Sequence, residues 1–406
     1  MLQGSFHRHF SRALYMTGKY ERARVLLTEA LDMFDKNSVS SENINYIALQ
    51  FNLANVYMFL KKYDDALQLY QTVLKTQQKV LSPDNRDFGE TYSGLAWAYG
   101  ALSQLGKALD LTFKALNHFK RVLPPNHPAI PRTLKGLAGN YKARGEFDLA
   151  LKYHLEALEQ FERYLPKDHP MVATALREIG DIYGAKGDLK TALDYDLRSC
   201  NMQKRNYPEG HILIASSLQV IGNLYRGLNQ LDEALKYHLE SIEIRKKLEP
   251  PDNFVSKHDL GETYLEMKKP KEAIDCFEFT YEVKSAAFGV EHKSTLSAKS
   301  CLGIACSENG DTARAQQIFE EVLEVQKRLY PNGDSAIGIT LRRMGSNYLR
   351  MNKIDEARTC FEEGLKIFEQ HLAADDYQII LVKKGLQQLL SYNNCRCCDF
   401  VTTDKD

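Results

Sequence analysis

An internal repeat with a period of 42 residues dominates this sequence of 406 residues. Its clearest marker is an alanine that recurs in the second of two successive helical patterns. The alanines are Ala23, Ala66, Ala108, Ala150, Ala192, Ala234, Ala273, Ala315 and Ala357. Successive steps are 43, 42, 42, 42, 42, 39, 42 and 42 residues. Such a regular register predicts stacked units that share one continuous core, rather than the two or three domains that the length alone suggests.

Other positions keep the same register. A tyrosine stands nine residues before the alanine, at Tyr57, Tyr99, Tyr141, Tyr183, Tyr225, Tyr264 and Tyr348. Alanine or glycine stands twelve residues before it, from Ala54 to Gly345. Glycine recurs five residues before it, at Gly18, Gly145, Gly187 and Gly310. Small residues let neighbouring helices approach closely, and a glycine accepts the positive φ that ends a helix. Each unit is therefore predicted to be a pair of antiparallel helices.

The stretch from Leu134 to Pro170 shows one complete unit. Apolar residues at Leu137 and Tyr141 form a helical stripe, and a second stripe starts after Gly145. The linkers read L-P-P-N-H-P at residues 123–128 and L-P-K-D-H-P at residues 165–170. Proline cannot continue a helix, so these linkers separate one unit from the next.

The order L-(G/A)-x-x-Y, then glycine, then alanine resembles the tetratricopeptide repeat. The 42-residue period and the L-P-x-x-H-P linker resemble the repeat type of kinesin light chains. This resemblance implies an all-α fold, a right-handed superhelical solenoid of antiparallel helix hairpins, whose first helices line a concave groove. In that family an Asn-Asn-Leu-Ala run lines the groove; here it survives in part, as Asn52-Leu53-Ala54-Asn55.

The repeat also sets the expected domain boundaries. We expect a partial repeat at residues 1–34, eight units of about 42 residues over 35–370 and a C-terminal capping helix at 371–392. Residues 393–406 are expected to be a disordered tail that contains Cys395, Cys397 and Cys398.

Composition narrows the class of partner and compartment. Lys+Arg and Asp+Glu both total 53, so the net charge gives no general attraction to nucleic acid or to an anionic membrane. No apolar run approaches the roughly 18 residues that a membrane span needs, and the start of the sequence lacks a signal peptide. The cysteines scattered through the helical patterns are expected to be reduced packing residues, which predicts a cytoplasmic protein without integral membrane association.

No set of residues predicts catalysis. Four of the eleven histidines, His127, His169, His211 and His292, fall in the linkers, where we expect solvated or capping roles. Equivalent residues of successive units lie about 10 Å apart, too far to share one metal ion. We therefore expect no enzyme activity, no cofactor and no metal.

The resemblance implies that the groove is the working surface. Its candidate residues are Trp97, Arg132, Lys135, Lys142, Arg177, Asn223 and Arg226. The cations are expected to bind acidic groups of a protein or peptide partner, and Asn223 to bond its backbone. An apolar side chain is expected to enter a space beside Trp97 that is lined by Gly94, Gly100, Gly136 and Gly139. The alternative is that the charges are ordinary solvated positions and that Trp97 packs in the core.

The leading function is therefore a non-catalytic interaction scaffold or adaptor that holds a peptide segment of a partner. One alternative is the repeat portion of a longer protein with an upstream ADP-ribosyltransferase or signalling NTPase domain. Another is a kinesin light chain-like cargo adaptor. Nucleic-acid binding is disfavoured by the zero net charge and by acidic units that interrupt the groove.

Overall fold

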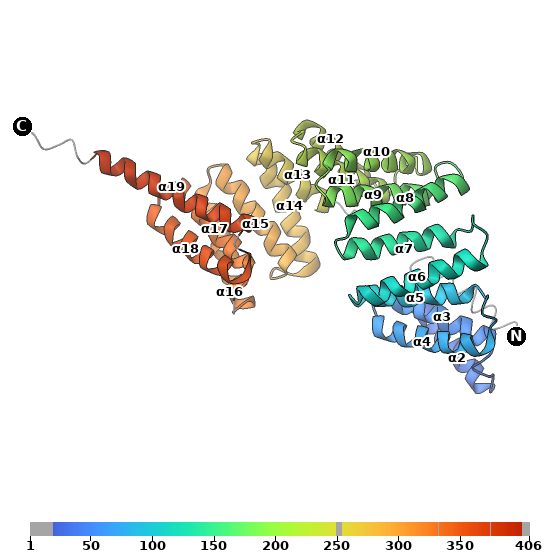
Figure 1. Ribbon diagram of the computed structural model, residues 1–406. Helices are drawn as coiled ribbons and strands as arrows, with labels where there is room; N and C mark the ends of the chain where they lie inside the picture. The colour runs from blue at the N-terminus through green and yellow to red at the C-terminus, as the bar shows by residue number, and fades with distance from the viewer. Residues whose placement is uncertain (1–18, 249–253, 332, 374, 400–406) are drawn as a thin grey trace, which may run out of the picture. The chain divides into compact units, whose positions relative to one another are not determined.

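The computed structural model describes residues 19–248, 254–331, 333–373 and 375–399. It divides into two compact units, Met1–Asn206 (unit 1) and Tyr207–Asp406 (unit 2), and each is described by itself (Figure 1). Every regular element in the described ranges is a helix. The predicted all-α fold class is thus confirmed for that part of the chain.

The helices of unit 1 follow one another after short connections. They are α2 (Tyr20–Lys36), α3 (Ile44–Phe59), α4 (Tyr63–Val80), α5 (Asp87–Ala101), α6 (Leu105–Val122), α7 (Ala129–Ala143), α8 (Phe147–Tyr164), α9 (Pro170–Ala185) and α10 (Leu189–Asn206). Those of unit 2 are α11 (Ile212–Gly227), α12 (Leu231–Lys246), α13 (Phe254–Glu266), α14 (Pro270–Phe288), α15 (Lys293–Glu308), α16 (Thr312–Leu329), α17 (Ser335–Arg350), α18 (Ile354–His371) and α19 (Tyr377–Asp399).

The helices pair into hairpins, as the repeat predicts. From α3 with α4 to α17 with α18, each odd-numbered helix packs on the even-numbered helix that follows it. First helices also contact each other directly, α3 with α5 and α5 with α7 in unit 1, and α15 with α17 and α17 with α19 in unit 2. Each unit is therefore a helical solenoid with a wall of first helices (Figure 1).

The turn inside each hairpin depends on one residue with positive φ. Gly145, Gly187 and Gly310 have φ of 79°, 83° and 87°, as expected for glycines that end a helix. In the other five hairpins the same position has the same conformation without glycine. These residues are Lys61, Ser103, Asn229, Lys268 and Asn352, with φ between 57° and 60°. The repeat register, rather than the glycine itself, marks this turn.

The linker histidines cap helices or short turns. Nδ1 of His169 accepts a hydrogen bond of 3.1 Å from the backbone N–H of Met171, at the start of α9. His127, His211 and His292 make the same bond to the residue two positions on, at 3.1 to 3.2 Å. The predicted capping role is confirmed, since each bond satisfies an N–H near the start of a helix.

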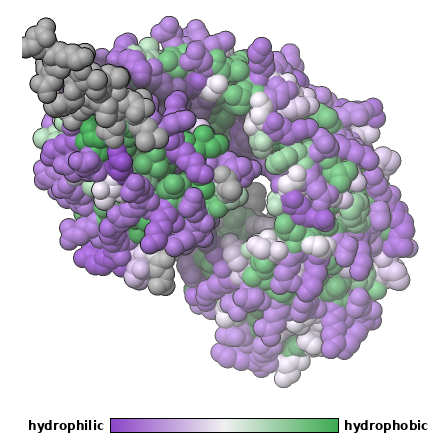
Figure 2. Space-filling model, turned by 60° about the vertical axis from the view of Figure 1, so that its left-hand side comes forward, coloured by the Kyte–Doolittle hydropathy of each residue, from purple (hydrophilic) through white to green (hydrophobic). Residues whose placement is uncertain are grey.

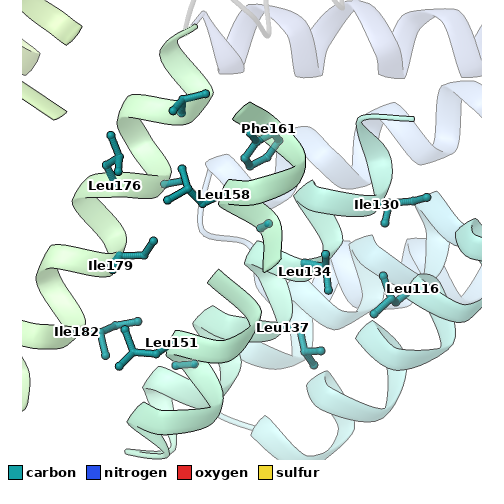
Figure 3. Packing of buried hydrophobic residues seen from close by; sticks show 14 of the residues in the cluster. Leu116, Ile130, Leu134, Leu137, Leu151, Leu158, Phe161, Leu176, Ile179 and Ile182 are labelled. Carbon is teal, nitrogen blue, oxygen red and sulfur yellow. The ribbon is translucent and has the colours of Figure 1, made fainter. Parts of the chain in front are cut away.

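Small residues are matched by large ones from the paired helix. A Cβ added at Gly303 would lie 2.6 Å from the ring of Phe319, and one added at Gly345 would lie 2.8 Å from the ring of Phe361. In unit 1, apolar side chains from α6 to α9, among them Leu134, Phe161 and Ile179, interlock in one continuous cluster (Figure 3). In this part of unit 1 the core thus runs from one hairpin into the next.

The two ends of the chain differ from the expectation or lie outside it. The first helix of the partial repeat falls within residues 1–18, outside the described residues. At the other end, the helix expected at 371–392 is α19, which begins at Tyr377 and continues to Asp399. The part of the expected disordered tail up to Asp399, including its three cysteines, is therefore helical.

Side chains on the visible surface are mostly hydrophilic, with hydrophobic residues between them (Figure 2). Within the described ranges, no helix combines the length and the apolar character that crossing a membrane requires. The polar surface leaves few places where apolar side chains gather, which makes the pocket described below distinctive.

Candidate functional site

A pocket of about 960 Å³ opens in unit 1 between α3, α5 and the start of α7. One face of α3 lines it, with residues at the helical spacing of three and four from Ile44 to Asn55. The facing side of α5 contributes Glu90 and Trp97, and α7 contributes Arg132. The pocket therefore lies on the wall of first helices, where the resemblance placed the groove.

Trp97 stands on the wall of this pocket with 42% of its surface exposed. Its ring packs edge-on against Phe59, with 5.0 Å between ring centroids. Phe51 and Ile44 extend the apolar lining along α3. A tryptophan that packs against another ring and remains partly exposed offers a surface for an apolar group.

Two asparagines bring unused hydrogen-bonding groups to the same pocket. Asn55 Oδ1 accepts a hydrogen bond of 2.6 Å from the Tyr70 hydroxyl, which fixes its amide and leaves Nδ2 available. Asn52 makes no side-chain hydrogen bond to any residue that the structure describes. An amide side chain can donate to a carbonyl and accept from an N–H at once, which matches a peptide backbone.

Arg132 reaches the pocket from α7 and is paired there. Its Nη2 donates to both carboxylate oxygens of Glu90, at 3.0 and 3.1 Å. Arg86 approaches the same carboxylate at 3.5 Å. Asp87 lines the same side of the pocket, so two guanidinium groups face two carboxylates there and their charges balance.

The other predicted cations of unit 1 are also paired with carboxylates. Lys135 Nζ lies 3.1 Å from Glu178 Oε2. Lys142 and Arg177 lie 3.6 and 3.7 Å from the same oxygen of Asp181. All of these side chains are partly exposed, and such ion pairs stabilise a protein by only about 0–1 kcal/mol each. A ligand carboxylate can therefore replace an internal one at little cost.

Buried titratable groups lie behind these ion pairs. Burial, together with the nearby charge of Lys135, lowers the pKa of His154 to about 4. Its Nδ1 lies 3.8 Å from Glu178 Oε2, and neither atom has a hydrogen-bond partner. At the equivalent position one hairpin on, burial and the charge of Asp181 raise the pKa of Asp196 to about 7. At neutral pH His154 is therefore uncharged beside the basic residues Lys135 and Lys142.

The two candidates in unit 2 form a group of their own. Asn223 Nδ2 donates to Asp259 Oδ2 at 3.2 Å, and the same oxygen accepts from Gln219 at 2.6 Å. Arg226 lies 2.5 Å from Glu262 and 3.4 Å from Glu266. The structure therefore brings the five candidates of unit 1 onto one wall of first helices, and gives Asn223 and Arg226 separate carboxylate partners.

Of the four glycines expected to line a space beside Trp97, Gly94 is among the residues that line the pocket with Trp97, and the other three are not. A Cβ at Gly94 would meet the ring of Tyr70 at 2.6 Å, so this glycine makes room for the protein's own tyrosine. A Cβ at Gly100 would lie 3.3 Å from the side chain of Asn140. Gly136 is almost open, and Gly139 has no neighbour within 4 Å of such a Cβ.

No group of three or more His, Cys, Asp or Glu residues within the described ranges could hold a metal ion. The five described cysteines outside α19 are free and buried. Burial raises the pKa of the Cys276 and Cys360 thiols to about 11, which keeps them protonated and unreactive.

Comparison with known proteins agrees with this geometry. The family model described as "Tetratricopeptide repeat" matches residues 45–121, 129–205, 253–328 and 294–370, and a second model of the same description matches 214–254. No curated protein sequence is significantly similar to the chain.

Several solved structures are similar. The apo form of RapI is 14% identical, with 90% of this chain and 98% of that chain covered and a TM-score of 0.67. The apo form of the quorum sensor NprR from B. thuringiensis is 18% identical, with 80% and 87% covered and a TM-score of 0.59. A putative kinesin light chain from Podosopora anserina is 23% identical, with 50% and 98% covered and a TM-score of 0.45. Since the repeat models match most of the sequence and the hairpins keep their register, this chain belongs to the tetratricopeptide repeat family.

Proposed function

We propose that this protein is a non-catalytic scaffold that captures a peptide segment of a partner protein in the groove of unit 1. The observation that carries the proposal is the convergence of Trp97, Asn52 and Asn55 on one pocket. An exposed aromatic face and unused amide groups together suit a ligand that alternates backbone polar groups with side chains. The partner is expected to be a protein or peptide with both apolar and acidic residues.

The apolar part of the ligand binds beside Trp97. Ile44 is 62% exposed and Trp97 is 42% exposed, so both bury further surface when the pocket is filled. Burial of apolar surface contributes roughly 25 cal/mol per Å², and a large side chain that fills such a pocket supplies most of the binding free energy. This part of the site sets the preference for an aromatic or aliphatic anchor.

The backbone of the ligand binds to the asparagines. Asn55 is held by Tyr70, and its Nδ2 is available to donate. Asn52 has both the oxygen and the nitrogen of its side-chain amide available. Each can pair with one peptide unit of an extended segment, because the two lie one helical turn apart on the same face of α3. Such contacts recognise a backbone and are independent of its sequence, which leaves specificity to the anchor and to charge.

An acidic group of the ligand binds to Arg132 and, further along, to Lys135, Lys142 and Arg177. Arg132 already shares the carboxylate of Glu90 with Arg86. Asp87 lies beside Arg86 on the same side, so a ligand carboxylate binds here by replacing an internal one in a partly exposed ion pair. In unit 2, Asn223 and Arg226 have the same kinds of side chain and are proposed to extend recognition along that unit's first helices.

Two further findings support this assignment. NprR, which shares this fold, has also been solved in complex with its cognate peptide NprX. The described cysteines outside α19 are free and buried, which suits a reducing compartment, and we propose a cytoplasmic location.

Selection from a library of random displayed 12-residue peptides tests the proposal. Wild-type protein is expected to enrich peptides with an apolar anchor near an acidic residue. Trp97→Ala and Asn52→Ala are each expected to lower the affinity for the selected peptides at least tenfold. Asn117→Ala is the matched control, because Asn117 is exposed on α6 outside the pocket. The proposal fails if both pocket variants bind these peptides as tightly as the control does.

A further inference from the structure

Cations on the first helices are usually paired with carboxylates in this protein. Arg132, Lys135 and Arg177 in unit 1 each have a carboxylate within 4 Å. In unit 2, Arg226 and Arg350 are paired in the same way, with Glu262 and Glu308. This pattern makes an unpaired cation on a first helix noteworthy.

Four cations at the end of unit 2 depart from the pattern. Arg342 and Arg343 lie on α17, and Lys383 and Lys384 lie on α19. None of the four takes part in an ion pair with any residue that the structure describes. We call these four residues the C-terminal basic patch.

The two arginines are half-buried and bonded only to neutral groups. Arg342 Nε donates to the amide oxygen of Gln378 at 3.1 Å. Arg343 donates to the hydroxyl of Ser300, and its Nε is buried without a hydrogen-bond partner. Burial lowers the pKa of both guanidinium groups, and the charge of Arg343 lowers the pKa of Arg342 further. The charge of Glu262 opposes this effect at Arg343, whereas no carboxylate among the described residues does so at Arg342, so an anion beside Arg342 has a free energy to gain.

One of the two lysines, Lys384, repeats the position of an arginine on the next first helix, and Lys383 is its neighbour in the sequence. Lys384 follows Arg342 by one repeat period of 42 residues, and α19 contacts α17 directly. Both lysines are exposed, so they are accessible to a ligand that also reaches α17. Tyr377, 67% exposed at the start of α19, supplies an apolar neighbour.

We propose that the C-terminal basic patch is a docking site for an acidic segment of a partner protein. Contacting first helices lie roughly 10 Å apart, which an extended chain spans in about three residues. The segment is therefore expected to be extended and to carry Asp or Glu at positions i and i+3, one for α17 and one for α19. The site lies in unit 2 and does not depend on the pocket around Trp97.

A polypeptide suits this patch better than a nucleic acid does. Nucleic-acid binding requires a run of phosphate contacts along a continuous basic surface. Here the first helices before α17 carry Glu262 and Glu308, and the whole chain has equal numbers of acidic and basic residues. A short acidic segment that contacts Arg342 and the two lysines meets only one of those carboxylates, Glu262, which acts on Arg343.

A calorimetric titration of the full chain with hexaglutamate, at low and at physiological salt, tests this proposal. Arg342→Gln/Arg343→Gln is expected to weaken binding at least tenfold, and Lys383→Gln/Lys384→Gln about threefold, because the exposed lysines are better screened. Lys383→Gln/Lys384→Gln changes only exposed side chains and is not expected to lower the thermal midpoint. It keeps the test valid if loss of the hydrogen bonds to Gln378 and Ser300 destabilises Arg342→Gln/Arg343→Gln. Arg314→Gln/Lys327→Gln is the control of equal charge, as both residues are already paired on α16.

The control is expected to bind hexaglutamate within twofold of wild type, and hexaglutamine is expected not to bind. Trp97→Ala is expected to leave hexaglutamate binding unchanged, so this test and that of the pocket can fail separately. Equal weakening in the control and in both patch variants overturns the proposal, because net charge alone would then explain binding. Tighter binding of a six-nucleotide oligothymidylate than of hexaglutamate also overturns it.

Discussion

The hydroxyl of Tyr70 donates a hydrogen bond of 2.6 Å to Asn55 Oδ1 and so joins the core of one hairpin to the pocket. Tyr70 comes from the second helix of its hairpin, is fully buried and lies against Gly94 of the next one. The same tyrosine thus packs two repeats together and orients an amide in the pocket. Stability of the stack and shape of the pocket are coupled at this residue.

Gly94→Ala is expected to lower stability by about 1–3 kcal/mol, because its Cβ would lie 2.6 Å from the Tyr70 ring and force it to move. Urea denaturation followed by circular dichroism measures this loss. Gly139→Ala is the control, since no atom lies within 4 Å of its Cβ. There, alanine is expected to raise stability by about 0.5–1 kcal/mol through its higher helix propensity. Equal effects of the two substitutions would contradict the packing role given to Gly94.

Ser103→Gly is expected to raise stability by about 1 kcal/mol. Ser103 has a φ of 59° at the hairpin turn where other repeats have glycine, and a side chain makes this conformation costly. The thermal midpoint measured by calorimetry is the readout. Ser93→Gly, inside α5, is the comparison and is expected to destabilise, because glycine weakens a helix interior. A loss of stability in Ser103→Gly would show that its side chain contributes more than its backbone strain costs.

Acid pH is expected to destabilise unit 1 through His154. The folded state holds its pKa at about 4, below the ordinary value near 6.5, so protons bind the unfolded chain more tightly. The stability contributed by this group is present above pH 6.5 and is lost as the pH falls toward 4, by roughly 2–3 kcal/mol. The nearby charges of Lys135 and Lys142 add to the effect of burial.

His154→Phe is expected to remove this part of the acid sensitivity. Phenylalanine occupies the equivalent position in three hairpins of unit 2, at Phe277, Phe319 and Phe361, so the fold accepts it. The measurement is the difference between thermal midpoints at pH 7 and pH 4.5, which should be smaller in the variant. An unchanged difference would mean that His154 is already charged in the folded protein.

The sequence was sufficient to predict the hairpins because their register depends on residues within one period. Gly145 and the proline linkers mark helix ends through local backbone chemistry, and the structure confirms them. The turn at Lys61 was not recognised, since a tertiary context holds a non-glycine residue in a conformation that local preference disfavours. The helical extension to Asp399 was missed for a similar reason, because a polar composition alone suggested disorder.

The site was harder to predict because its details depend on neighbouring repeats. The sequence indicated which positions lie on first helices, and it singled out Trp97 and the run from Asn52 to Asn55. It could not show that Tyr70 reaches from the preceding hairpin to cover Gly94. Nor could it show that Lys135 and Glu178, 43 residues apart, meet as an ion pair. Contacts across hairpins depend on how far each long side chain reaches, which spacing alone does not determine.

The emission of Trp97 during titration with a library-selected peptide tests the central proposal most directly. It is the single tryptophan of the chain, so its fluorescence reports on the pocket without any label. Burial by a bound apolar anchor is expected to shift the emission to shorter wavelength and to saturate with the same Kd as calorimetry gives. Asn52→Ala should raise the Kd read from that curve at least tenfold, whereas Asn117→Ala should reproduce the wild-type curve. Binding by calorimetry without any change in Trp97 emission would contradict the account, because the peptide would then bind elsewhere.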